Sequence, residues 1–100
     1  GIVWSSDETQ ALISLWADEK IQALLEGARH NHKIFAKLAE NLNEKGFEAR
    51  DGKQCQDKVR KLKLKYRSIL DNNNKSGNSR KNWEFFEVMD RVLGSRPTSR

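Results

Sequence analysis

Residues 51–72 read DGKQCQDKVRKLKLKYRSILDN and combine a narrow apolar stripe with a dense set of positive charges. The apolar residues follow steps of four, three, four and three, which keep side chains on one face of a helix. They are Cys55, Val59, Leu62, Tyr66 and Ile69. Because this face needs a core to rest on, the segment predicts an amphipathic helix that packs on the rest of the chain.

The positive charge is concentrated on this helix and just after it. Residues 51–80 hold nine Lys or Arg against three Asp, a net charge of +6, which exceeds the +5 of the whole chain. Residues 1–26, by contrast, hold one Lys against five acids. A helix face that is merely solvated normally mixes both signs at i, i+4 spacing, and this face barely does. The imbalance favours a surface that binds an anionic partner.

Length and composition limit the class of protein. One hundred residues allow one domain with a core of its own. A single cysteine excludes an internal disulfide and a thiolate zinc site, and it favours a reducing compartment. Neither a membrane span nor a signal peptide is recognisable, so we expect a soluble, intracellular protein. The chain opens with Gly rather than Met, which suggests a domain excised from a longer protein.

The first half of the chain predicts two helices. Ser5 followed by Glu8 fits a capping box, and apolar residues recur at mostly three- and four-residue steps from there to Gly27, where the first helix should end. Asn31 is a suitable N-cap for a second helix, and Gly46 is a suitable C-cap.

The second half predicts the basic helix and one more. Residues 48–50 form a short turn, and Asp51 with Gln54 repeats the capping box at the start of the basic helix. Residues 71–82 are polar and without periodicity, which indicates a mobile loop. A short apolar fourth helix then starts near Asn82 and stops at Gly94.

We therefore predict an all-α fold, with three helices in a helix-turn-helix arrangement and a short packed fourth helix. The domain should span residues 4–93, with residues 1–3 as a disordered N-terminal end and residues 94–100 as a disordered linker. The predicted core residues are apolar or aromatic and lie on the inward faces of the four helices. They are Trp4, Leu12, Trp16, Phe35, Leu38, Cys55, Val59, Leu62, Tyr66, Trp83 and Phe86.

This helix order, with a last helix that is basic outside and apolar inside, is typical of proteins that read the major groove of double-stranded DNA. Side chains near the start of the basic helix, opposite its apolar stripe, are best placed to contact base edges. They are Lys53, Gln56, Asp57 and Arg60. Flanking cations should contact phosphates and supply affinity. They are Arg50, Lys61, Lys63, Lys65 and Arg67, to which loop residues Lys75 and Arg80 could add.

Two residues of the basic helix keep more than one interpretation. Asp57 could accept a hydrogen bond from cytosine or form an ion pair with Lys61 four residues on. Leu64 points away from the apolar stripe. It could contact a thymine methyl group, pack under the fourth helix or belong to a protein interface.

Catalytic and metal chemistry find little support. His30 and His32 diverge on a helix and have no carboxylate or thiolate partner nearby in sequence, so we predict no metal site. The same histidines and Cys55 form no set of nucleophile, base and orienting group. We therefore predict a protein that is not an enzyme and needs no cofactor.

Several motifs together resemble one family. They are Trp4-Ser-Ser-Asp-Glu-Thr, Asn31-His-Lys-Ile-Phe, Gly46-Phe, Gln54-Cys-Gln-Asp-Lys-Val-Arg-Lys-Leu-Lys-Leu-Lys-Tyr-Arg and Ser76-Gly77 before the aromatic fourth helix. The pattern is similar to the trihelix (GT-factor) branch of Myb/SANT-like DNA-binding domains and covers about residues 4–93. Of the three core tryptophans of Myb repeats, Trp4 matches the first, while Phe35 and Val59 stand at the other two.

The resemblance implies a nuclear transcription regulator that reads DNA with the third helix, at the same four base-contacting positions as above. Protein partners in a transcription complex are also implied, but neither a membrane nor a small-molecule substrate. SANT-like domains can instead bind histone tails or corepressors. Their third helix tends to be acidic or mixed in charge, whereas this one is basic, so we favour DNA.

Overall fold

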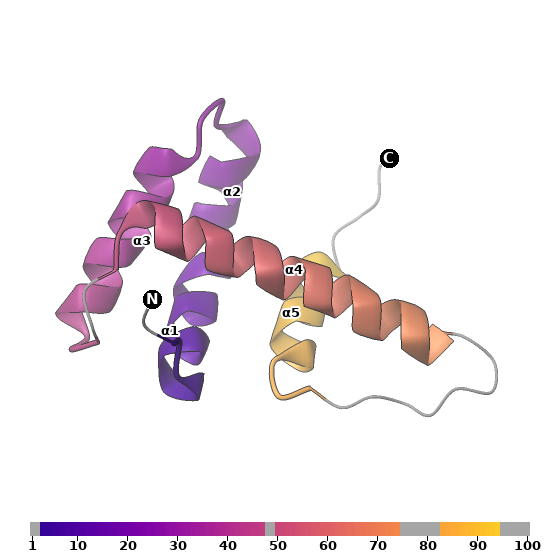
Figure 1. Cartoon of the computed structure of the whole chain (residues 1–100). Helices are drawn as coiled ribbons and strands as arrows, with labels where there is room; N and C mark the ends of the chain where they lie inside the picture. Colours follow the sequence, from indigo (N-terminus) through magenta and orange to yellow (C-terminus); the bar gives the residue numbers. More distant parts are fainter. Residues whose placement is uncertain (1–2, 48–49, 75–82, 95–100) are drawn as a thin grey trace. The chain divides into compact units, whose positions relative to one another are not determined.

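The computed structural model describes residues 3–47, 50–74 and 83–94. Within these ranges the chain forms five α-helices and no strand (Figure 1). The predicted all-α class is confirmed, although with five helices in place of four. The chain divides into two compact units, Gly1–Val59 and Arg60–Arg100, which we call the first and the second unit.

The single helix predicted up to Gly27 is wrong, because two helices occupy this stretch. Helix α1 spans Ser6–Trp16 and helix α2 spans Glu19–Gly27. Asp18 caps α2 by accepting a hydrogen bond from the backbone amide of Lys20 at 2.8 Å. The Gln22 side-chain amide donates to the Trp16 carbonyl oxygen at 2.7 Å and so satisfies the end of α1. Asp favours a cap over a helix interior, which explains the break.

The predicted start of α1 is confirmed at its N-cap. Ser5 Oγ accepts a hydrogen bond from the Glu8 backbone amide at 3.0 Å. The Thr9 hydroxyl also donates to the Ser5 carbonyl oxygen at 2.8 Å. The Glu8 carboxylate, which the capping box would turn back to Ser5, instead contacts a distant residue described below.

Helix α3 spans His32–Glu44. Asn31 stands at the predicted N-cap position but makes no side-chain cap bond, and its Oδ1 is buried with no hydrogen-bond partner among the described residues. Gly46 fulfils the predicted role after the helix, because its φ of +95° is a conformation that glycine adopts without strain. Its amide donates to the Asn43 carbonyl oxygen at 3.1 Å.

The core of the first unit lies mainly between α1 and α3, with α2 touching both. Its buried side chains come from α1, α3 and the first turns of α4. They are Leu12, Ile13, Trp16, Phe35, Leu38, Ala39, Leu42, Cys55 and Val59. Gly52 lets the start of α4 approach the backbone of α3, because a Cβ there would lie 2.8 Å from the Ala36 amide nitrogen.

Helix α4 spans Gly52–Asn74 and carries the predicted apolar stripe, all of which is buried. Its predicted start is confirmed by a complete capping box. The backbone amide of Gln54 donates to Asp51 Oδ1 at 2.8 Å, and the backbone amide of Asp51 donates to Gln54 Oε1 at 3.0 Å. The helix continues past Asp71, where a loop was predicted, because polar residues alone do not stop a helix and no Gly or Pro intervenes before Gly77. Residues 75–82 of that predicted loop lie outside the described residues.

Helix α5 spans Phe86–Leu93 and belongs to the second unit. It starts later than predicted, because residues 83–85 form a turn in which the Phe86 amide donates to the Trp83 carbonyl oxygen at 3.0 Å. Phe85 and Met89 supply the buried side chains of this segment. The Tyr66 hydroxyl donates to Asp90 Oδ1 at 2.6 Å.

Three aromatic residues assigned to the core are only half-buried: Trp4, Trp83 and Phe86. Cations cover two of these rings. The Arg50 guanidinium lies 4.2 Å from the centre of the Trp4 ring, and Lys65 Nζ lies 5.4 Å from that of Trp83. Phe86 stacks on Tyr66 with ring centroids 5.2 Å apart. The reason for the correction is that a ring can pack one face inward and offer the other to a cation.

Candidate nucleic-acid interface

The outer side of α4 carries the side chains expected to contact base edges. In the first unit Lys53 and Gln56 are exposed and Asp57 is half-buried, and in the second unit Arg60 is exposed. Lys53 Nζ lies 3.8 Å from Asp57 Oδ2, so Asp57 forms an ion pair with the residue one turn before it. An exposed pair of this kind adds little stability, about 1 kcal/mol at most.

Four of the cations expected to contact phosphates lie on α4 in the second unit. Lys61, Lys63, Lys65 and Arg67 are all exposed. Their stretch of α4 presents one sign of charge to solvent, while Leu62, Tyr66 and Ile69 are buried. Lys65 differs from the others because it also covers the Trp83 ring. The segment can therefore hold its helix in place through its apolar side and attract anions through its exposed side.

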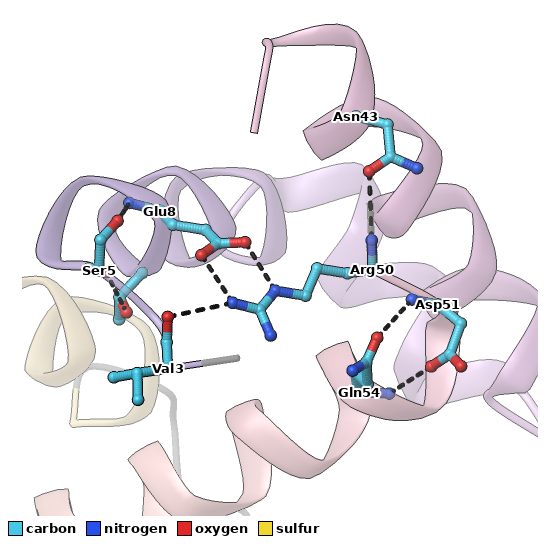
Figure 2. Close-up of polar contacts among 8 residues, drawn as sticks. Val3, Ser5, Glu8, Asn43, Arg50, Asp51 and Gln54 are labelled. Carbon is cyan, nitrogen blue, oxygen red and sulfur yellow. Dashed lines mark hydrogen bonds and ion pairs between the residues drawn. The ribbon is translucent and has the colours of Figure 1, made fainter. Parts of the chain in front are cut away.

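Arg50 does not belong to this exposed set, and its assignment as a phosphate contact is corrected. Its side chain is buried, with only 5% of the residue exposed, and it binds the Glu8 carboxylate, which is 4% exposed (Figure 2). Arg50 Nε donates to Glu8 Oε2 at 2.7 Å and Nη2 donates to Oε1 at 2.8 Å. Such a bidentate pair is among the strongest side-chain interactions, and it commits the guanidinium to the interior.

Neighbouring groups complete this buried pair. Arg50 Nη2 also donates to the Val3 carbonyl oxygen at 3.4 Å, and the Arg50 amide donates to Asn43 Oδ1 at 3.3 Å (Figure 2). The hydrogen bond from Arg50 lowers the pKa of Glu8 below its ordinary value of 4.5. At neutral pH the Glu8 carboxylate is therefore ionised and neutralises the charge of Arg50. The pair joins the first turn of α1 to the segment just before α4.

Sequence reasoning missed this ion pair. Glu8 was interpreted as the fourth residue of a capping box, and Arg50 as the end of a turn and as a phosphate contact. The two residues lie 42 positions apart, so no local spacing links them. The sequence gives one indirect signal, since Arg50 lies before the capping box of Asp51 and Gln54 and therefore outside the basic helix.

The cysteine and the histidines are the remaining residues considered for nucleophilic or metal chemistry. Cys55 is fully buried, and this burial raises the pKa of its thiol to about 11. At neutral pH the thiol is protonated and poorly nucleophilic. The rings of His30 and His32 lie 6.2 Å apart. In the part of the chain that the structure describes, no three His, Cys, Asp or Glu side chains group together as metal ligands would.

None of the described helices has the length and apolar character to cross a bilayer.

Comparison with known proteins identifies relatives of this sequence. The family model described as the Myb/SANT-like DNA-binding domain matches residues 2–92. A human protein, Myb/SANT-like DNA-binding domain-containing protein 7, is 26% identical over 93 residues, which cover 93% of this chain and 26% of the human protein. The chain thus spans about a quarter of the length of this relative. No solved structure matches the present chain.

Proposed function

Because the chain belongs to the family of Myb/SANT-like DNA-binding domains, we propose that it binds double-stranded DNA with a preference for particular base sequences and places α4 in the major groove. The observation that carries this proposal is the division of α4 into a buried apolar stripe and an exposed face rich in Lys and Arg. A helix of this kind fits the width of the major groove, and its cations release counterions from phosphates.

Within this proposal the exposed residues take two roles. Lys53, Gln56 and Arg60 contact base edges, since Lys or Arg can bind guanine and Gln can bind adenine. Asp57 either accepts from the cytosine amino group or remains paired with Lys53. Lys61, Lys63, Lys65 and Arg67 contact phosphates, which fixes the register without reading the sequence. Arg50 has no part in either role.

We place the domain in the trihelix branch of the family and in a nuclear regulator of transcription. The support for the branch is the run from Gln54 to Arg67, which contains the Gln-Cys-x-x-Lys and Tyr-Arg elements on one helix. The support for the setting is the family's DNA-binding description. Partners in a transcription complex would be bound by the remainder of a longer protein or by surfaces away from α4.

The first test is a selection of random double-stranded oligonucleotides with the purified chain, followed by a salt titration on the enriched duplex. We expect an enriched motif and an affinity that falls steeply with salt, because phosphate contacts release counterions. Equal affinity for all sequences would remove the base-reading roles. If DNA is not bound and histone-tail or corepressor peptides are, the protein-interaction alternative replaces the proposal.

Two variants separate the roles on α4. Arg60→Ala should cost about 1 to 3 kcal/mol on the selected duplex and relax the base preference at one position. Lys61→Ala should weaken all duplexes alike and reduce the salt slope by about one. Lys61 suits this purpose better than Lys65, which also contacts Trp83. Lys37→Ala, which removes an exposed cation from α3, is the matched control and should change neither quantity.

A further inference from the structure

Leu64 is an exposed apolar side chain in the middle of a cationic surface. It is 61% exposed, whereas Leu62 two positions before it and Tyr66 two positions after it are buried. The structure thus removes one of its three interpretations, packing under the fourth helix. Two remain: contact with a thymine methyl group and contact with a protein.

The surroundings of Leu64 decide between these two. On a helix its nearest surface neighbours are the residues three and four positions away. They are Arg60, Lys61, Arg67 and Ser68, all exposed and all in the second unit. A protein partner that covered Leu64 would also have to desolvate and neutralise the three cations of this set, at a cost that grows with each buried charge. An anionic polymer such as DNA neutralises the same cations with its own phosphate charges.

We propose that Leu64 is a specificity-determining residue that contacts the C5-methyl group of a thymine in the bound duplex. This inference rests on the proposed DNA binding and deepens it. Thymine is the base that presents an apolar group in the major groove, and no other base edge offers a surface that a leucine side chain can cover. The geometry of α4 fits this role, since Leu64 follows the proposed base-contacting residue Arg60 by one helical turn.

The expected effect follows from the size of the contact. Removing one buried methyl or methylene group weakens an apolar contact by about fourfold in affinity. Replacing thymine by deoxyuridine deletes only the methyl group and leaves all hydrogen-bonding groups in place. Truncating Leu64 to Ala deletes the other half of the same contact. The two changes should therefore not add.

The experiment uses the purified chain and the duplex enriched by selection from random oligonucleotides. Each thymine in the enriched motif is replaced in turn by deoxyuridine, and Kd is measured for the wild type and for Leu64→Ala. At one or two positions we expect the replacement to weaken wild-type binding about fourfold and to leave Leu64→Ala binding unchanged. Leu64→Ala itself should lose about four- to tenfold on the thymine duplex.

A control variant and a folding check make the result specific. Leu24→Ala truncates another exposed leucine, on α2 in the first unit, where 55% of the residue is exposed. It should show the same deoxyuridine penalty as the wild type. Thermal melts followed by circular dichroism should give the same Tm for Leu64→Ala as for the wild type, because the removed side chain is mostly exposed.

The outcomes that overturn the proposal differ from those that overturn DNA binding. If the wild type enriches a motif but Leu64→Ala keeps the full deoxyuridine penalty at every thymine, the Leu64 assignment falls and the proposed function stands. A selected motif without thymine has the same consequence. If the wild type binds no duplex, both proposals fall together.

Discussion

Arg50 lies just before the basic helix and the cations of residues 60–67 lie on it, yet their environments are opposite. Arg50 precedes α4 in the first unit and is buried against Glu8, with two hydrogen bonds to its carboxylate. Arg60, Lys61, Lys63, Lys65 and Arg67 lie in the second unit and are exposed. In one region the positive charge stabilises the fold, and in the other it is exposed to solvent.

The difference shows that charge alone does not define a binding surface. A net charge counts Arg50 with the other cations, but its charge is cancelled by a carboxylate inside the protein. Among these cations, the exposed ones on α4 therefore contribute to the field outside the protein, whereas Arg50 does so much less. This distinction predicts that the two regions respond to mutation in different measurements, stability in one case and affinity in the other.

The largest expected effect tests the folding role of the buried pair. Glu8→Ala removes the carboxylate that neutralises the buried Arg50 charge, so we expect the free energy of unfolding to fall by about 3 to 5 kcal/mol. Denaturant unfolding followed by circular dichroism measures this change. Arg67→Ala, which removes an exposed cation, is the control and should change stability by no more than about 0.5 kcal/mol.

A double variant shows whether the loss comes from the stranded charge. Glu8→Leu combined with Arg50→Met should recover much of the stability lost in either single variant, because apolar residues of similar size can replace a buried pair. If Arg50→Ala kept full stability and lost affinity for DNA, the assignment of Arg50 to the fold rather than to the binding surface would be wrong. That result would return Arg50 to the binding surface.

A smaller effect is expected at the point where α4 approaches α3. In Gly52→Ala the new Cβ would lie 2.8 Å from the Ala36 amide nitrogen and 3.2 Å from the Phe35 carbonyl carbon, which forces the backbone to shift. We expect a loss of about 1 to 3 kcal/mol, measured as a lower Tm. Gly27→Ala is the matched control, because nothing lies within 4 Å of the Cβ that this substitution adds. An unchanged Tm for Gly52→Ala would mean that this approach is not tight in solution.

The smallest effect is the pH dependence of stability in the acid range. Because Arg50 lowers the pKa of Glu8 in the folded state, the unfolded chain binds a proton more readily. The contribution of the pair is therefore complete above the unfolded pKa, near 4.5, and is lost as pH falls through the lowered folded value. Urea unfolding at a series of pH values should show this loss, and Glu8→Gln should flatten it. If Glu8→Gln lost stability equally steeply at acid pH, the loss would arise from other carboxylates.

The sequence by itself determined the features that depend on neighbours along one helix. The apolar stripe of α4, its capping box at Asp51 and Gln54, and the cap at Ser5 all follow from short-range spacing, and all are found. The exposed positions of Lys53, Gln56 and Arg60 follow in the same way, because a residue opposite a buried stripe points outward. The all-α class required nothing more than these periodicities.

The tertiary structure decided which groups far apart in sequence meet. It placed Arg50 on Glu8, laid Lys65 over the half-buried Trp83 ring and left Leu64 exposed. The break of the first predicted helix at Asp18 is, by contrast, a local capping effect. The physical reason is that burial and ion pairing are properties of three-dimensional neighbours. Local spacing can orient a side chain on its helix, but it cannot specify what that side chain will touch.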